Sequence, residues 1–194
     1  KKKFNDQITI IEDDILKISE SSISNNQLIV FGNLPYNIST KILTKWILSD
    51  NKKCWYKNLI LMFQKEVADR IIAKVNSKNY GRLSIISNWK LEIKKIMDIS
   101  SSCFFPKPKV ESTLLKFTPK LKYFSFESQK NLEMITRILF SQRRKKIKSS
   151  FKKIFHKNYE NISTKLNIDL NLRPQNLDYD TYYTITKEYE NLRS

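Results

Sequence analysis

The sequence predicts an α/β sheet followed by a purely helical region, and two observations support this fold class. Short, nearly continuous apolar runs alternate with helical patterns through the first 119 residues, as expected where helices connect the strands of one sheet. After Pro119, helical periodicity alone remains. We therefore expect two domains, residues 1–119 with the sheet and residues 120–194 built from helices.

The predicted strands are short apolar runs that end at polar or turn-forming residues. They cover residues 8–11, 28–31, 59–63, 93–99 and 112–117. The first three runs are almost uninterrupted, which is typical of strands covered on both faces, and the strand–helix alternation favours parallel pairing.

Helices are predicted where apolar residues recur every three or four positions. The first would begin at a cap formed by Ser39 or Thr40 and bury Ile42, Leu43, Trp46 and Ile47. Later patterns of this kind cover residues 66–74, 83–89, 129–139, 147–155, 163–166 and 179–190.

The charge balance points to a polyanionic partner. Lys and Arg number 36 against 19 Asp and Glu, a formal net charge of +17, and nucleic acid is the commonest polyanion that such proteins bind. A lysine-rich proteome is the alternative, but it leaves the scarcity of acids unexplained.

Several site types are excluded by inventory. Cys54, Cys103 and the single histidine, His156, cannot supply a zinc site. The two glycines, Gly32 and Gly81, are too few and too far apart for a glycine-rich nucleotide loop. No apolar run reaches the length of a membrane span, so we expect a cytoplasmic, monomeric protein that does not enter a membrane.

The segment Asn33-Leu34-Pro35-Tyr36 directly follows a predicted strand, where α/β sheets place ligands. The Asn33 side chain and the carbonyl of Pro35 can accept hydrogen bonds from both hydrogens of an exocyclic amine, which directs the nitrogen lone pair toward a methyl donor. Tyr36 offers a flat face for the base. The alternative is a strand-ending turn in which Asn, Pro and Tyr serve folding alone.

A second aromatic candidate lies in the proline-containing stretch of residues 104–112. Phe104 could stack on the opposite face of an extruded base, and stacking contributes about 1–3 kcal/mol per base. Lys107 and Lys109 could reach phosphate. The alternative is a linker into the last strand.

Asp14 follows the first predicted strand. Its carboxylate could accept a hydrogen bond from the adenine amine of a cofactor while the backbone of Ile15 contacts the ring edge. The alternative is a helix cap.

A basic segment follows the first helix of the C-terminal region. Residues 137–157 hold nine Lys or Arg and no acid, and a helical arrangement would gather the cations on one ridge. A solvated lysine-rich face is the alternative, but solubility alone would favour interspersed Glu. We therefore expect a phosphate-binding surface that includes Arg143, Arg144, Lys145, Lys146 and Lys148.

Taken together, these stretches resemble the ribosomal small-subunit RNA adenine dimethyltransferase family. The similar stretches are VFGNLPYNIST at residues 30–40, FQKEVADRI at 63–71, NSKNYGRLSI at 76–85, FFPKPKVEST at 104–113 and FSQRRKKIKSS at 140–150. The resemblance implies a Rossmann-like class I methyltransferase sheet with a helical C-terminal domain, S-adenosylmethionine as cofactor, and dimethylation of two adjacent adenines near the 3′ end of small-subunit rRNA. The partner would be this rRNA or the assembling small subunit.

By this resemblance, residues 33–36 and Phe104 would hold the target adenine. Asp14, Ile15 and Asn33 would contact the cofactor, and the basic segment would contact rRNA.

The sequence also departs from that family. The Gln-Asn-Phe-Leu motif, the glycine-rich loop and the acid that binds the cofactor ribose have no counterpart in these 194 residues. We expect that the chain begins about two strands into the methyltransferase domain and by itself binds the cofactor poorly. The alternatives are a large-subunit rRNA methyltransferase of the resistance type and a non-catalytic RNA-binding assembly factor.

Overall fold

A computed structural model describes residues 7–49 and 54–193 of the chain. In chain order the elements are η1 (Glu20–Ser22), β1 (Leu28–Asn33), α1 (Ser39–Ile47), β2 (Tyr56–Gln64), α2 (Lys65–Ile71), α3 (Arg82–Lys90), β3 (Leu91–Ile99), η2 (Ser101–Cys103), β4 (Ser112–Pro119), α4 (Gln129–Phe140), α5 (Lys148–Phe155), η3 (His156–Asn158), α6 (Tyr159–Lys165), η4 (Pro174–Asn176) and α7 (Tyr179–Asn191).

Four strands form one mixed sheet in the order β1-β2-β4-β3. Strands β1 and β2 are parallel, whereas β4 runs antiparallel to both β2 and β3. The expected parallel pairing is therefore correct for the first pair and wrong for β3 and β4. The reason is that no crossover helix separates β3 from β4, and strands joined by a hairpin connection pair antiparallel.

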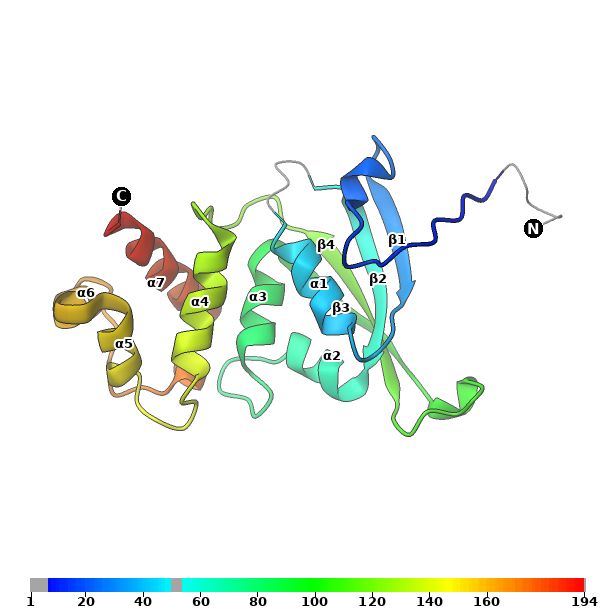
Figure 1. The fold of residues 1–194 in the computed structure, drawn as a ribbon. Helices are drawn as coiled ribbons and strands as arrows, with labels where there is room; N and C mark the ends of the chain where they lie inside the picture. Colours follow the sequence, from blue (N-terminus) through cyan, green and yellow to red (C-terminus); the bar gives the residue numbers. More distant parts are fainter. Residues whose placement is uncertain (1–6, 50–53, 194) are drawn as a thin grey trace.

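The helices form layers on one side of the sheet. Helices α1, α2 and α3 lie against one face, and α4 to α7 lie beyond α3 (Figure 1). The predicted apolar face of α1 is buried, since Ile42, Leu43, Trp46 and Ile47 are each at most 5% exposed. One continuous core of buried residues extends from the sheet through α3 into α4 and α7.

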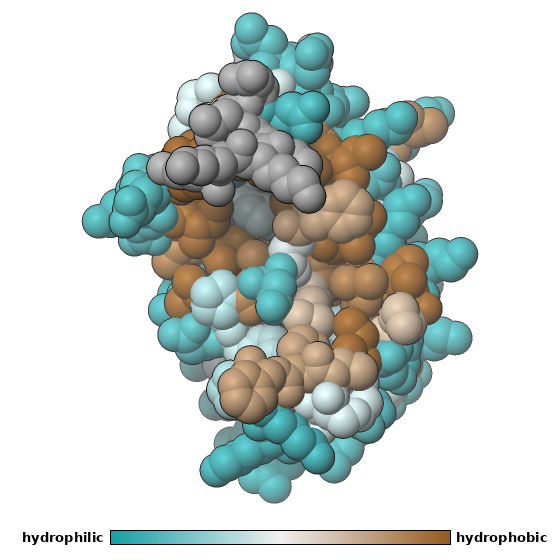
Figure 2. All heavy atoms as spheres, turned by 90° about the vertical axis from the view of Figure 1, so that its right-hand side faces the viewer, coloured by the Kyte–Doolittle hydropathy of each residue, from teal (hydrophilic) through white to brown (hydrophobic). Residues whose placement is uncertain are grey.

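The opposite face of the sheet carries no helix among the described residues, and apolar side chains gather on this side of the molecule (Figure 2). Partly buried and exposed positions alternate along β1, so that Ile29 is 55% and Phe31 75% exposed. The expectation that this strand is covered on both faces is therefore wrong for the described part of the chain.

The strand expected at residues 8–11 does not form. These residues have no regular structure, and Ile8, Ile10 and Ile11 are more than half exposed. A strand is stable only when its N–H and C=O groups pair with a neighbour. The described residues provide no neighbouring strand for this run, although its β-branched composition favours the extended conformation.

Hydroxyl groups of buried tyrosines connect the sheet region to the helical region. Tyr80, just before α3, donates to the carbonyl of Leu177 at 2.9 Å, and Tyr183 in α7 donates to the carbonyl of Ile85 in α3 at 2.9 Å. Burial raises the pKa of both phenols well above the ordinary value, so the neutral donors persist across the physiological pH range.

No helix in the described ranges is long and apolar enough to cross a membrane.

We predict that Tyr183→Phe lowers the free energy of unfolding by about 1–3 kcal/mol, because the buried carbonyl of Ile85 loses its donor. Tyr189→Phe is the matched control, since that hydroxyl contacts the sulfur of Met134 at 3.8 Å and should contribute less. Denaturant unfolding measures both variants. Equal losses in the two variants would contradict a connecting role for the Tyr183 hydrogen bond.

Candidate functional site

The carboxyl ends of β1, β2 and β3 and the amino end of β4 lie at the same end of the sheet, which is called this edge below. In the strand register, Asn33 pairs with Met62, Gln64 pairs with Ser112, and Ser112 pairs with Ile99. The loop after β1 and the loop between β3 and β4 therefore leave the same edge. This edge holds the carboxyl ends of β1 and β2, where α/β folds bind ligands.

The loop after β1 is held by its own backbone. Asn33 and Pro35 are exposed and Tyr36 is half-buried. The carbonyl of Pro35 accepts from the N–H of Ile38 at 3.1 Å. Helix α1 then begins at Ser39 without a side-chain cap, because the hydroxyl of Ser39 donates to the carbonyl of Tyr36 at 3.1 Å. The predicted cap is therefore wrong, and Ser39 stabilises the loop instead.

A hydrogen bond from strand β4 fixes the ring of Tyr36. The two hydroxyl oxygens lie 2.7 Å apart, and Ser112, the first residue of β4, is fully buried. Sequence reasoning missed Ser112, because a contact across 76 positions leaves no periodic signal. The hydrogen bond joins the Asn33–Tyr36 loop to the strand that follows residues 100–111.

The second loop holds the remaining aromatic candidate. Phe104 is half-buried, whereas Phe105 is fully exposed and precedes a cis proline. The loop that carries both rings leaves the sheet at the same edge as the loop of Tyr36. Lys107 and Lys109 are exposed on this loop.

Ion pairs and hydrogen bonds hold the base of the second loop. Lys65, at the start of α2, pairs with Glu111 at 2.6 Å, and the hydrogen bond from that pairing raises the lysine pKa. Asp98 accepts from Thr113 at 2.6 Å and pairs with Lys95 at 2.7 Å. The Lys95 hydrogen bond, followed by that of Thr113, lowers the pKa of Asp98. These contacts position both ends of the loop against the sheet.

The proposed cofactor residues form a turn rather than the end of a strand. The carboxylate of Asp14 is exposed and accepts from the N–H of Leu16 at 3.0 Å within this turn. No helix begins there among the described residues, so the alternative of a helix cap is wrong as well. The carbonyl of Ile15 accepts from Lys45 of α1 at 3.0 Å. That contact ties the turn to the helix that follows the Asn33–Tyr36 loop.

The basic segment is a turn followed by a helix. Residues 141–147 form turns between α4 and α5, so the expected single helical ridge of cations is wrong over this stretch. The fully buried Ile147 donates its N–H to the carbonyl of Leu172, which interrupts the helical pattern. Arg144, Lys145, Lys146 and Lys148 are exposed.

Three cations of the basic segment have partners within the chain. Lys148 lies 3.9 Å from the carboxylate of Glu160. Lys146 donates to Asn171 at 2.9 Å, and Arg143 is half-buried and donates to the carbonyls of Ser77 and Lys78. Arg143 therefore holds the loop before α3, although its guanidinium keeps further donors.

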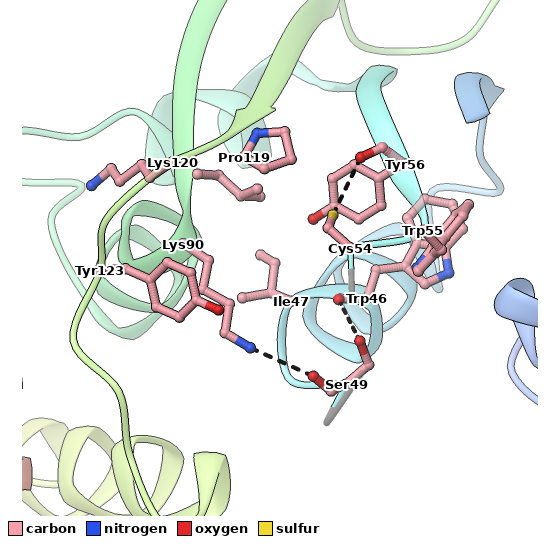
Figure 3. Close-up of a pocket in the computed structure, with 11 residues that line it drawn as sticks. Trp46, Ile47, Ser49, Cys54, Trp55, Tyr56, Lys90, Pro119, Lys120 and Tyr123 are labelled. Carbon is pink, nitrogen blue, oxygen red and sulfur yellow. Dashed lines mark hydrogen bonds between the residues drawn. The ribbon is translucent and has the colours of Figure 1, made fainter. Parts of the chain in front are cut away.

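A small, partly open pocket lies at the other end of the sheet (Figure 3). Its wall includes Tyr56 at the start of β2, Leu91 at the start of β3 and Pro119 at the end of β4. The pocket measures about 90 Å³, whereas sites for ligands and cofactors usually measure about 300–1,000 Å³. The pocket lies away from the candidate site, and it is too small for a typical ligand.

Known structures share this arrangement of sheet and helices. A dimethyladenosine transferase from Plasmodium falciparum superposes with a TM-score of 0.69 at 28% identity, over 84% of this chain and 66% of that one. The 23S rRNA methyltransferase ErmE superposes with a TM-score of 0.61 at 16% identity, over 93% of this chain and 71% of that one. The chain therefore has a Rossmann-like methyltransferase fold.

Sequence comparison narrows the class. The family model for ribosomal RNA adenine dimethylase matches residues 1–191, and the chain belongs to this family of enzymes. A protein of Pelagibacter ubique named ribosomal RNA small subunit methyltransferase A is 59% identical over the whole of this chain and 73% of its own length. A Zymomonas mobilis protein of the same name is 37% identical over 97% of this chain and 67% of its own length.

We predict that the Tyr36–Ser112 hydrogen bond contributes about 0.5–1.5 kcal/mol to folding. A double-mutant cycle with Tyr36→Phe and Ser112→Ala, measured by denaturant unfolding, should give a coupling free energy of this size. Strictly additive effects would show that the two hydroxyls act independently. Tyr36→Phe with Thr118→Ala is the matched control, because Thr118 bonds to Asn58.

Proposed function

We propose that this protein transfers methyl groups from S-adenosylmethionine to the N6 amines of two adjacent adenines near the 3′ end of small-subunit rRNA. The substrate would be this RNA within the assembling small subunit in the cytoplasm. One observation carries the proposal. The Asn33–Tyr36 loop and the loop with Phe104 leave the sheet at the same end. Family membership supports the choice of an RNA adenine as the methyl acceptor.

The Asn33–Tyr36 loop suits an exocyclic amine. That nitrogen is a weak nucleophile because its lone pair is delocalised into the purine ring. The side-chain oxygen of Asn33 and the carbonyl of Pro35 would each accept one amine hydrogen, and the bond from Ile38 to Pro35 leaves the carbonyl a second lone pair. With both hydrogens bound, the lone pair points toward the incoming methyl group, and orientation lowers the barrier.

The aromatic residues would hold the ring of the base. Tyr36 would stack on one face, with its orientation fixed by the hydroxyl of Ser112, and Phe104 would cover the other face. A ring fixed in advance loses less conformational entropy when the base arrives. Stacking on both faces also replaces part of the stacking that the adenine loses on leaving its helix.

Asp14, Ile15 and Asn33 would bind the cofactor. Asp14 is exposed and uses one carboxylate oxygen for Leu16, so the other could accept from an adenine amine beside the backbone of Ile15. Asn33 would lie next to the methionine end. When bound, S-adenosylmethionine supplies an electrophilic methyl group. The side chains named here bind and orient the base rather than act as strong bases.

The exposed cations would bind the phosphates of the RNA. Lys107 and Lys109 lie on the loop of Phe104, and Arg144, Lys145, Lys146 and Lys148 lie around the turn after α4. Arg143 would contribute mainly by holding the loop before α3. Phosphate contacts of this kind position a protein on RNA, while the base-binding loop selects the atom that is modified.

We predict that Asn33→Ala and Tyr36→Ala each reduce methyl transfer by on the order of 100-fold or more, because each removes a group that orients the amine. The measurement is transfer of labelled methyl groups to unmodified small subunits. It uses the protein extended at its N-terminus with the corresponding segment of the Pelagibacter ubique relative. Tyr36→Phe, which keeps the ring, should retain more activity than Tyr36→Ala. Full turnover by both alanine variants would refute the assignment.

Replacing Arg144 and Lys145 by Gln should weaken RNA binding and flatten its salt dependence. Each lost phosphate contact should reduce the slope of log K against log salt by about 0.7–0.9. Fluorescence anisotropy with a labelled hairpin from the 3′ end of small-subunit rRNA measures the effect. Lys187→Gln, on the distant helix α7, is the control. An unchanged slope would remove the turn after α4 from the RNA-binding surface.

A further inference from the structure

A groove of about 600 Å³ lies between the sheet region and the helical region. Its walls come from α2, from the loop before α3, from the start of α3 and from the end of α4 with the turn that follows. Tyr80 and Phe140 form its apolar floor, with ring centroids 6.4 Å apart. This groove has no role in the methyl-transfer step proposed above.

The rim of the groove is strongly cationic. Arg70, Lys78, Arg82 and Arg143 line it, against the single carboxylate of Glu66. Glu66 pairs with Arg70 across one turn of α2. The three remaining cations have no carboxylate partner within the groove, which favours an anionic occupant.

Arg82 carries the clearest sign of a missing partner. Its Nε is buried and has no hydrogen-bond acceptor among the described residues, and its terminal nitrogen lies 3.7 Å from Glu133, which is half exposed. A buried donor without an acceptor costs about 1–3 kcal/mol. The Arg82 side chain is nevertheless 40% exposed, so the terminal N–H groups of its guanidinium can donate to a phosphate oxygen in the groove.

The position of the groove connects the two proposed RNA contacts. Helix α2 begins directly after Gln64 at the edge of the candidate site, and Arg143 at the far wall belongs to the basic turn. The Asn33–Tyr36 loop, α2, the loop before α3 and the basic turn follow one another along the lower side of Figure 1. The seven residues of α2 span roughly 10 Å, about three stacked nucleotides.

We propose that this groove binds the sugar–phosphate backbone of the RNA strand between its contacts with the basic turn and with the Asn33–Tyr36 loop. The inference rests on the proposed function, because it assumes that the same RNA reaches both places. Lys78 and Arg82 bind phosphates, and Arg143 shapes the wall through its bonds to the carbonyls of Ser77 and Lys78. The groove therefore sets the path of the strand and not the identity of the base.

The test compares Lys78→Gln and Arg82→Lys with Lys94→Gln in the full chain. Lys94 is exposed on β3 and does not line the groove, so its substitution removes the same charge as Lys78→Gln. The probe is the labelled hairpin from the 3′ end of small-subunit rRNA, measured by fluorescence anisotropy over a range of salt concentrations. Unfolding midpoints confirm that each variant is folded.

Lys78→Gln should weaken binding several-fold and lower the salt slope by about 0.7–0.9, whereas Lys94→Gln should leave the slope unchanged. Arg82→Lys keeps the charge but removes Nε and the forked geometry, so it should lower affinity with little change in slope. Groove variants that bind as the wild type does would overturn the inference and leave the proposed function standing. A wild-type chain that does not bind the hairpin would instead count against the proposed function.

Discussion

The pairing of β2 on both of its sides determines where the candidate site lies. Strand β2 is parallel to β1 and antiparallel to β4, and its residues Leu59, Leu61 and Phe63 are fully buried. A shift of the register by one residue would turn these side chains out of the core, so the register is strongly fixed. With the register fixed, Asn33 and Ser112 must lie at the same edge. The loops of Tyr36 and Phe104 therefore leave the sheet at the same end.

A second constraint comes from the aromatic core between the sheet region and the helical region. Phe140 at the end of α4 stacks on Tyr182 at 5.8 Å. The Phe140 ring also packs beside Gly81, where an added Cβ would lie in ordinary van der Waals contact with it at 3.9 Å. Tyr80 and Tyr183 donate hydrogen bonds across the same boundary. Because these contacts hold α3 against α4 and α7, the groove between them has a defined shape, and its cations keep a fixed spacing.

The sequence predicted most of the local structure, because local structure depends on periodicity and turn chemistry. The apolar face of α1, the strand at residues 112–117 and the buried face of Ile147, Phe151, Ile154 and Phe155 all appear in the structure. The run at residues 8–11 failed as a strand because pairing requires a neighbour, which composition does not supply. The basic stretch does not form one helix, because the N–H of Ile147 donates to the carbonyl of Leu172 instead of to a carbonyl one turn earlier. The chemical roles assigned to residues 33–36 and Phe104 remain predictions.

Contacts between distant segments could not be predicted from periodicity. The bond from Tyr36 to Ser112 and the bonds from Arg143 to the loop before α3 join positions more than 60 residues apart. Arg143 shows why this matters, because its place in a basic run predicts a phosphate contact as strongly as it does for Arg144. The fold gives the two residues different environments, with Arg143 half-buried and Arg144 exposed.

Under the proposed function, the distribution of charge would separate attraction to RNA from selection of the base. The loop of residues 33–36 has no ionisable group except the hydroxyl of Tyr36, and its polar atoms are an amide and backbone carbonyls. Cations lie instead on the second loop, along the groove and around the basic turn. A cation beside the target amine would draw electron density from the nitrogen that must attack the methyl group. In the proposed function, phosphate contacts outside residues 33–36 would allow tight binding to a polyanion while the amine stays nucleophilic. Affinity and turnover would then be separable by mutation.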